Sequence, residues 1–366
     1  MGQTQFDTPC AWVAEAWAAA QEIRVELIAD LHRQAMARSS GRSSVPRWMA
    51  TMAYALGLAF SVCAASAAPP DPADFNGFDV ANASVPTQAI QRGGPPKDGI
   101  PAIDRPKFVR AEQARLAGDD RILGVFLNGQ ARAYPVRILN WHEVVNDRFP
   151  GPSGDRAVVV TYCPLCGTGM AFDPPARAGA AGFGVSGLLY NSDVLLYDRA
   201  TQSLWSQILA TAISGPLKGT RLQPVPLTHT SWVDWRRRHP ATEVLSTDTG
   251  FERDYVRDPY AGYDRIQRLM FDVQHRDDRF PPKEWVLGLQ VNGVPKAYPF
   301  SALARTVDAR GELPDTVGGK KLRIRYDRAH GTAEAFDDQG RLLPGTMAYW
   351  FAWVAFHPKT EVLRAP

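Results

Sequence analysis

The stretch from residue 160 to residue 173, VTYCPLCGTGMAFD, places Cys163 and Cys166 three positions apart between a strand-like run and a glycine turn. Cysteine thiolates are soft ligands, and a CxxC pair on a tight turn can direct both sulfurs at one ion of copper, zinc or iron. The same spacing suits a dithiol that exchanges with other disulfides, or a structural disulfide. We rank the metal site first and keep all three interpretations open.

A metal site with two cysteines needs further ligands, and His142 in NWHEVVND is the best candidate in the sequence. The segment around it is expected to lie between a hairpin and the CxxC strand. Glu143 would then orient the imidazole through a hydrogen bond, or act as a ligand itself. A histidine beside a tryptophan is equally well explained as a structural residue whose hydrogen bonds are satisfied.

Polar residues in the apolar stretch after the CxxC could line a pocket over the cysteines. Asn191, Asp193 and Gln207 are the candidates, and a small ligand would sit among them. Asp198 and Thr201 are better explained as caps of a helix that includes Trp205.

Several cofactor and partner classes find no support in the sequence. Attachment of c-type haem requires a histidine directly after the second cysteine, where Gly167 stands. No P-loop or dinucleotide GxGxxG occurs at a strand-helix junction, so no nucleotide cofactor is expected. The net charge is only +3, and the basic run at 236–238 lies in a segment with the features of packing, so nucleic acid is not an expected partner.

The chain resembles itself at two offsets. Residues 122–173 match residues 286–337 without a gap at 16 of 52 positions, and residues 232–245 match residues 350–363 at eight of 14. Each copy begins with apolar alternation around a central Asn-Gly, which is the strongest short-range hairpin signal. Each copy later carries a Trp-x-x-Trp-x-x-x-His-Pro block, which predicts a short helix that ends before the proline. We infer an internal duplication.

Only one copy carries the cysteines. Asp327 and His330 of the second copy align with Cys163 and Cys166, and Thr306 aligns with His142. The offset falls from 164 to 118 between the matched blocks, so the first copy holds 46 more residues, within 174–230. A purely structural CxxC would not need this asymmetry, which favours a functional site in the first copy.

These features predict a β-rich α+β fold of two related subdomains, the first with a larger insertion. The first repeat copy is expected over 102–250, with the CxxC site, and the second, plain copy over 251–366. Residues 68–101 are rich in proline, glycine and alanine and predict a linker.

The N-terminal part of the chain predicts export. Residues 48–68 are uncharged, follow Arg47 and end near an Ala-Ser-Ala sequence, which is the layout of a signal peptide over 45–67. Residues 1–44 would be a doubtful extension produced by a misplaced start, or a short segment before an uncleaved anchor at 48–68. In either case the remainder would be periplasmic or extracellular, and only the N-terminal segment would contact a membrane.

Long motifs support one family resemblance. AYPVRILNWHEVVND, VTYCPLCGTGMAFD, FGVSGLLYNSDVLLYDRATQSLWSQ and LSTDTGFERDY together resemble the bacterial and archaeal domain of unknown function numbered 3179, from about residue 100 to the C-terminus. The resemblance implies an exported or membrane-associated protein and supplies no activity.

The sequence therefore predicts an exported protein whose CxxC site binds copper or zinc, for metal handling or as a catalytic centre. The alternatives are a periplasmic thiol-disulfide oxidoreductase and a non-catalytic binding module with a structural disulfide. A small ligand, or a protein that donates or accepts the metal, would be the partner. Whether the protein is an enzyme is not decided by these motifs.

Overall fold

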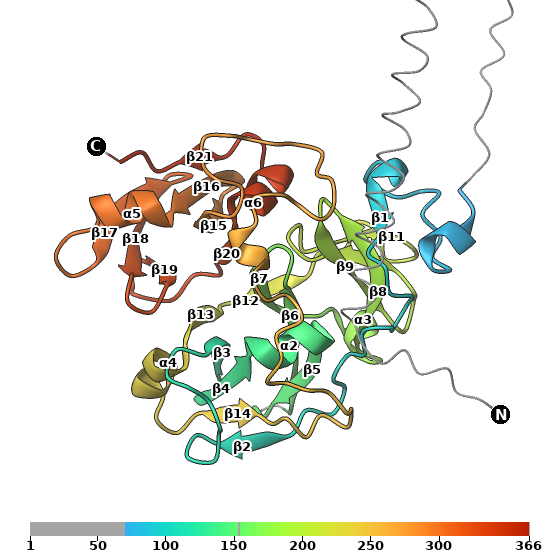
Figure 1. Ribbon diagram of the computed structural model, residues 1–366, viewed down its shortest axis with the longest axis horizontal. Helices are drawn as coiled ribbons and strands as arrows, with labels where there is room; N and C mark the ends of the chain where they lie inside the picture. The colour runs from blue at the N-terminus through green and yellow to red at the C-terminus, as the bar shows by residue number, and fades with distance from the viewer. Residues whose placement is uncertain (1–69, 153, 366) are drawn as a thin grey trace, which may run out of the picture. The chain divides into compact units, whose positions relative to one another are not determined.

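The structure is a computed structural model that describes residues 70–152 and 154–365 (Figure 1). The predictions for residues 1–44 and for the signal or anchor segment fall outside the described residues. Among the residues that are described, we find no helix with the length and apolar character needed to cross a bilayer.

The described chain is built mainly from strands, which form five small sheets. The first sheet contains β1 (Ile90–Arg92), β8 (Phe183–Tyr190), β9 (Asp193–Asp198), β10 (Leu204–Ser206) and β11 (Thr211–Ser214). The second contains β12 (Gln223–Val225), β7 (Thr168–Asp173), β6 (Arg156–Cys163) and β5 (Val144–Phe149).

The third and fourth sheets are each built around a hairpin. The third contains β13 (Thr228–Ser231), β3 (Arg121–Leu127), β4 (Gln130–Pro135), β14 (Glu243–Leu245) and β2 (Phe108–Arg110). The fourth contains β20 (Thr346–Tyr349), β15 (Trp285–Val291), β16 (Val294–Pro299) and β21 (Glu361–Val362). The fifth is the meander β17 (Glu312–Val317), β18 (Lys320–Asp327) and β19 (Thr332–Asp337).

The helices are short. The α-helices are α2 (Val136–His142), α3 (Ala176–Gly179), α4 (Trp232–Arg238), α5 (Phe300–Thr306) and α6 (Trp350–Phe356), and the 3₁₀ turns are η1 (Pro72–Phe75), η2 (Thr87–Ala89) and η3 (Tyr263–Arg265). The two helices predicted from the Trp-x-x-Trp blocks are confirmed as α4 and α6. Each ends one residue before the histidine that precedes the proline, and this histidine is the C-cap.

The predicted α+β fold of two subdomains is wrong. The five sheets have a five-bladed β-propeller arrangement, and residues from Pro70 onward form one compact unit with no division near residue 250. The physical reason is the size of the helices: none of the described α-helices exceeds seven residues, so they pack singly against the sheets and cannot form a layer of their own.

The matched sequence segments fold into matching elements. Both Asn-Gly hairpins are confirmed, as β3 with β4 and β15 with β16. At each turn the asparagine and the glycine have positive φ, 52° and 79° at Asn128 and Gly129, as a two-residue hairpin turn requires. The sheets around the two hairpins pair in the same order, β13-β3-β4-β14 and β20-β15-β16-β21.

The predicted linker over 68–101 is wrong from Pro70 onward. β1 pairs with β8 at the edge of the first sheet, and Phe78, Val80 and Ile90 are buried against apolar residues of β8, β9 and β11. The apolar residues scattered among the prolines therefore pack as part of the fold.

Residues 174–230 form most of the first sheet. β8, β9, β10 and β11 all fall within 174–230, and their apolar residues pack against those of β6 and β7. The helix predicted around Trp205 is wrong, since Trp205 lies in β10 and donates from its indole nitrogen to Asp198 at 2.9 Å. This sheet covers the CxxC hairpin.

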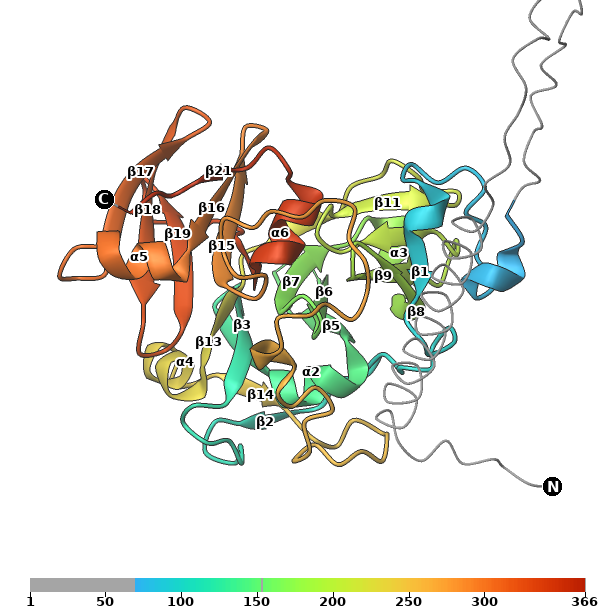
Figure 2. The same cartoon turned by 45° about the horizontal axis from the view of Figure 1, so that its top comes forward.

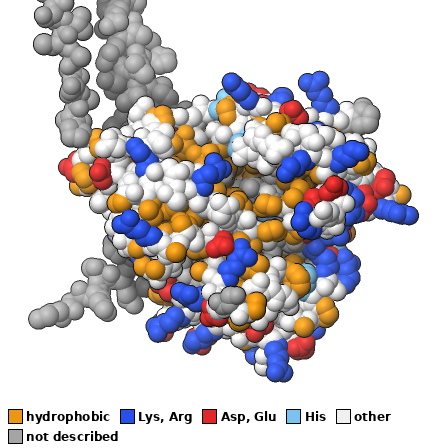
Figure 3. Space-filling view, turned by 180° about the vertical axis from the view of Figure 1, so that it is seen from behind, with side chains coloured by type: hydrophobic (Ala, Val, Ile, Leu, Met, Phe, Trp, Pro, Cys, Tyr) orange, Lys and Arg blue, Asp and Glu red, His pale blue; other side chains and the backbone are white. Residues whose placement is uncertain are grey.

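The surface carries charges of both signs. Figure 3 shows lysine and arginine side chains interspersed with aspartate and glutamate on one face, with hydrophobic side chains visible between them. No single sign of charge covers that face.

Each hairpin sheet packs a glycine against a helix tryptophan, and this packing can be tested. A methyl group at Gly124 would meet the Trp235 ring at 2.4 Å, and one at Gly288 would meet the Trp353 ring at 2.2 Å. We expect Gly124→Ala and Gly288→Ala each to lower the free energy of unfolding by about 1–3 kcal/mol, because the added methyl group would overpack the site. Urea denaturation measures the change.

Gly118→Ala is the matched control, since its added methyl would lie 3.5 Å from Val233, at ordinary contact distance. Equal stability of all three variants would contradict this packing.

Candidate functional site

The two cysteines flank the turn between β6 and β7. Cys163 ends β6, Thr168 begins β7, and the Cys166 nitrogen donates to the Cys163 carbonyl at 3.3 Å. Gly167 has a φ of +66°, and a methyl group there would meet the Trp285 ring at 2.7 Å. The turn thus needs glycine both for its backbone conformation and for its contact with the second half of the chain.

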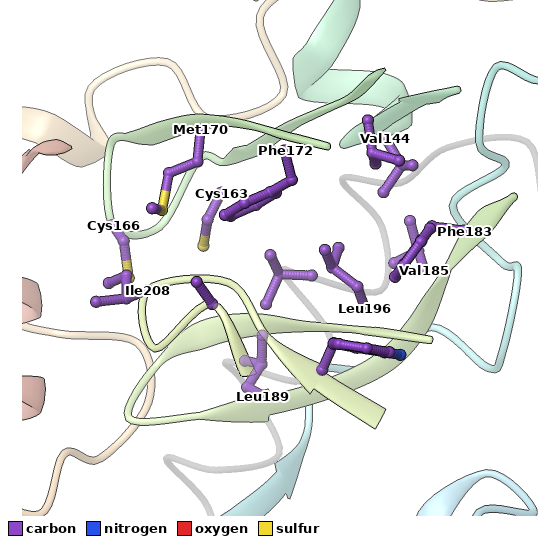
Figure 4. Close-up of a cluster of buried hydrophobic side chains, with 14 of the residues drawn as sticks. Val144, Cys163, Cys166, Met170, Phe172, Phe183, Val185, Leu189, Leu196 and Ile208 are labelled. Atoms are coloured by element: carbon purple, nitrogen blue, oxygen red, sulfur yellow. The ribbon is translucent and has the colours of Figure 1, made fainter. Parts of the chain in front are cut away.

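Both thiols are free and buried. Cys163 is 2% exposed and Cys166 is 0% exposed. Figure 4 shows their sulfurs pointing from the β6–β7 hairpin toward the β8–β9 hairpin. The Cys166 sulfur lies 3.3 Å and the Cys163 sulfur 3.8 Å from the Ser192 carbonyl oxygen.

Asp193 completes a cluster with the two cysteines. It follows a tight turn in which Asn191 and Ser192 both have positive φ, 52° and 65°, and it begins β9. One carboxylate oxygen of Asp193 and the two sulfurs all lie within 4.8 Å of one another. Two thiolates and a carboxylate are a ligand set suited to zinc or another transition metal.

A buried polar network holds the Asp193 carboxyl in place. The Ile208 nitrogen donates to one oxygen at 3.2 Å, and the Thr168 hydroxyl lies 3.3 Å from the other. Gln207 in turn accepts from Thr168 at 2.7 Å and donates to the Thr161 hydroxyl at 2.8 Å. These contacts fix the direction of the carboxyl toward the sulfurs.

Burial disfavours the charged forms of the acids in the cluster. It raises the pKa of both cysteine thiols and raises the pKa of Asp193 to about 7. Glu143 has a pKa raised to about 8 by burial and, secondarily, by the charge of Asp193. A cation bound among these groups would displace protons from the thiols.

His142 is not part of the cluster. One ring nitrogen contacts the Pro101 carbonyl oxygen at 2.7 Å and the other contacts the Tyr255 hydroxyl at 2.6 Å. Burial lowers the pKa of His142 to about 4, so the ring is neutral. Its prediction as a metal ligand is therefore corrected: α2 points the ring at the loops before β2 and after β14, where both nitrogens are satisfied.

Two of the other predicted residues lie beside the cluster, and one faces away from it. Glu143 is buried beside the cluster and interacts electrostatically with Cys163 and Asp193. Gln207 orients Thr168, as described above. Asn191 faces away from the sulfurs, since its side chain donates to the Ala355 carbonyl and accepts from the Gln274 nitrogen.

Sequence reasoning missed two residues beside the thiols. Ser192 presents its carbonyl to both sulfurs, and a main-chain contact leaves no pattern of residue types. Tyr263 is buried and interacts electrostatically with both cysteines. It follows a long irregular segment, where no residue pattern in the sequence indicates a place beside the cysteines.

The second half of the chain closes the site. The Tyr349 nitrogen of β20 donates to the Cys166 carbonyl at 2.9 Å, and β20 lies beside β7 (Figure 1). Lys283 holds the segment around Tyr263 in place. Its ammonium donates hydrogen bonds to the Tyr263 and Ile266 carbonyls, each at 2.5 Å.

Comparison with known proteins gives one match. A family model described as a protein of unknown function (DUF3179) matches residues 97–360. No curated protein and no solved structure matches the chain.

The raised pKa of Glu143 makes a prediction about stability. Because the pKa in the folded protein, about 8, lies above the ordinary value of 4.5, the folded state holds this proton more tightly. The stabilisation is present at low pH and is lost as pH rises from about 4.5 to 8. Between pH 5 and pH 8.5 the parent protein should lose unfolding free energy, and we expect Glu143→Gln to lose about 3 kcal/mol less. Urea denaturation with a chelator present measures both losses.

Glu361→Gln at an exposed position is the control and should leave the pH dependence unchanged. If the Glu143→Gln protein lost as much stability as the parent over the same range, the buried carboxyl would not be protonated as described.

Proposed function

The chain belongs to the DUF3179 family of proteins of unknown function, and we propose that this member binds one soft transition metal ion, copper or zinc, through Cys163, Cys166 and Asp193. The observation that carries the proposal is the convergence of two buried thiols and a carboxyl within 4.8 Å. The carboxyl comes from a different hairpin, so the cluster is a product of the fold rather than of neighbouring residues.

Charge balance supports a metal in this position. Deprotonating three acids in a buried setting is costly unless a cation compensates them. A divalent ion with two thiolates and one carboxylate leaves a net charge of about −1, and Cu(I) with two thiolates and a neutral Asp193 leaves the same. Protonation of Glu143 avoids a further negative charge.

Burial and pKa argue against the thiol-disulfide oxidoreductase. An exchanging cysteine must be reached by its partner and has a lowered pKa. Here both thiols are almost completely buried and their pKa is raised. A structural disulfide is the weaker alternative, since both cysteines are free.

A metal-binding measurement tests the proposal. The full-length protein, purified and equilibrated with Zn(II) or with Cu(I), should contain about one ion per chain by elemental analysis. Cys163→Ser/Cys166→Ser should lose the ion. The chain also holds Cys10 and Cys63, so Cys10→Ser/Cys63→Ser is the matched control and should retain it.

Asp193→Asn separates the two metals. A carboxylate is a hard ligand, so its loss should weaken Zn(II) binding by about 10–100-fold and change Cu(I) binding much less. Occupancy of either metal should fall as pH drops below 7, because the thiols regain their protons. A protein that binds no metal and whose Cys163–Cys166 disulfide equilibrates with glutathione would instead establish the redox function.

We further propose that the protein is exported and acts in the periplasm or outside the cell, with a small ligand or a metal-transferring protein as its partner. The support is the uncharged stretch at 48–68 and the Ala-Ser-Ala sequence near its end. Cell fractionation with N-terminal sequencing should find the protein outside the cytoplasm and beginning near Ala68. A cytoplasmic protein with an intact N-terminus would overturn the proposal.

A further inference from the structure

The turn between β18 and β19 is the counterpart of the CxxC turn, and it lines a cleft of its own. Asp327 and His330 stand at the positions that correspond to Cys163 and Cys166. The turn lies next to α4 (Figure 2). Between them is a cleft of about 390 Å³.

Arginine side chains dominate this cleft. They come from α4, from the loop between α5 and β17, from β18, and from the β18–β19 turn, and they are Arg237, Arg238, Arg310, Arg325 and Arg328. Only two acidic residues, Asp234 and Asp327, line the cleft with them. Four separate segments thus bring positive charge to one place.

Part of this charge is already paired. Arg237 and Arg238 form ion pairs with Asp234 at 2.5 and 2.7 Å. Arg238 and Arg325 also pair with the buried Glu334, which lies behind the cleft. Asp308, which does not line the cleft, interacts electrostatically with Arg310. Five arginines against four carboxylates leave about one positive charge without a partner.

The least engaged guanidinium groups are those of Arg310, which interacts electrostatically with Asp308, and of Arg328. Neither guanidinium makes a hydrogen bond or an ion pair within the part of the chain that the structure describes. Both residues are exposed, so their side chains can reach a ligand in the cleft. Guanidinium groups bind phosphate and carboxylate oxygens through paired, charge-assisted hydrogen bonds.

A buried hydroxyl in the cleft also lacks a partner. Thr332 is 3% exposed, lines the cleft, and its hydroxyl oxygen has no hydrogen-bond partner among the described residues. The Arg238 Nε also lacks a hydrogen-bond partner among the described residues. Buried polar groups are rarely left unsatisfied, so these two groups indicate a ligand that accepts hydrogen bonds.

The arrangement does not suit a metal cation. Asp234, Asp327 and His330 do lie within 4.8 Å of one another. However, the Asp234 carboxylate is already engaged by two arginines and by the Thr230 hydroxyl at 2.8 Å. One ring nitrogen of His330 contacts the Ser231 hydroxyl at 2.8 Å. The excess positive charge would also repel a cation.

We propose that this cleft binds a small molecule that carries a phosphate group, with Arg310, Arg328 and Thr332 as its principal contacts. A tetrahedral dianion offers enough acceptor oxygens for donors that arrive from several directions. The cleft is larger than a phosphate ion needs and lies in the lower range of small-molecule sites, which favours an esterified phosphate. The proposal does not depend on the metal site, which lies in the other copy.

Calorimetric titration of the full-length protein tests the proposal with two probes, inorganic phosphate and glycerol 3-phosphate. We expect both to bind, the ester at least as tightly as the free ion. Arg310→Ala and Arg328→Ala should each weaken binding by about tenfold or more, as loss of a hydrogen bond to a charged group predicts. Thr332→Val, which keeps the shape of the side chain, should weaken it about threefold or more.

Arg341→Ala is the matched control, because it removes an arginine that pairs with Asp337 outside the cleft. It should change affinity less than twofold. The proposal is overturned if neither probe binds at about 1 mM, if Arg341→Ala weakens binding as much as the cleft variants do, or if malonate binds and both phosphates do not. Stoichiometric Zn(II) that disappears in His330→Ala, with no phosphate binding, would also overturn it.

Discussion

The packing of two tight turns against each other determines the character of the candidate site. The β6–β7 turn supplies both thiols and the β8–β9 turn supplies Asp193 and the Ser192 carbonyl. Because both turns are buried among apolar residues of the first two sheets, of β20 and of α6, water is excluded from the acids they carry. Burial then raises their pKa values and favours the protonated forms unless a cation replaces the protons.

The site depends on both halves of the chain although all of its candidate ligands lie in the first. Gly167 lets the CxxC turn approach Trp285, and the Cys166 carbonyl accepts from the Tyr349 nitrogen. Tyr263 covers the sulfurs from the segment that joins the halves. A second half without cysteines therefore still has a role at the site, because it supplies the wall that excludes water.

The two corresponding hairpin turns lie in different surroundings. In the first half the turn faces the sheet that contains β8–β11 and is buried, whereas in the second half the corresponding turn is partly exposed. The second turn instead lies beside α4, among arginines. What packs against the turn sets its burial, and burial together with neighbouring charge decides whether it suits a metal ion or an anion.

The sequence by itself determined the local elements and the identity of the cysteine pair. The Asn-Gly hairpins, the two tryptophan helices, the DUF3179 family and the nearness of Cys163 to Cys166 follow from short-range patterns, because turns and short helices are specified by neighbouring residues. Only the tertiary structure decided which distant groups meet. It brought Asp193 to the sulfurs, turned His142 away from them, and joined the sheets into one compact propeller arrangement instead of two subdomains. The reason is that such contacts depend on the packing of whole sheets, which local residue patterns do not encode.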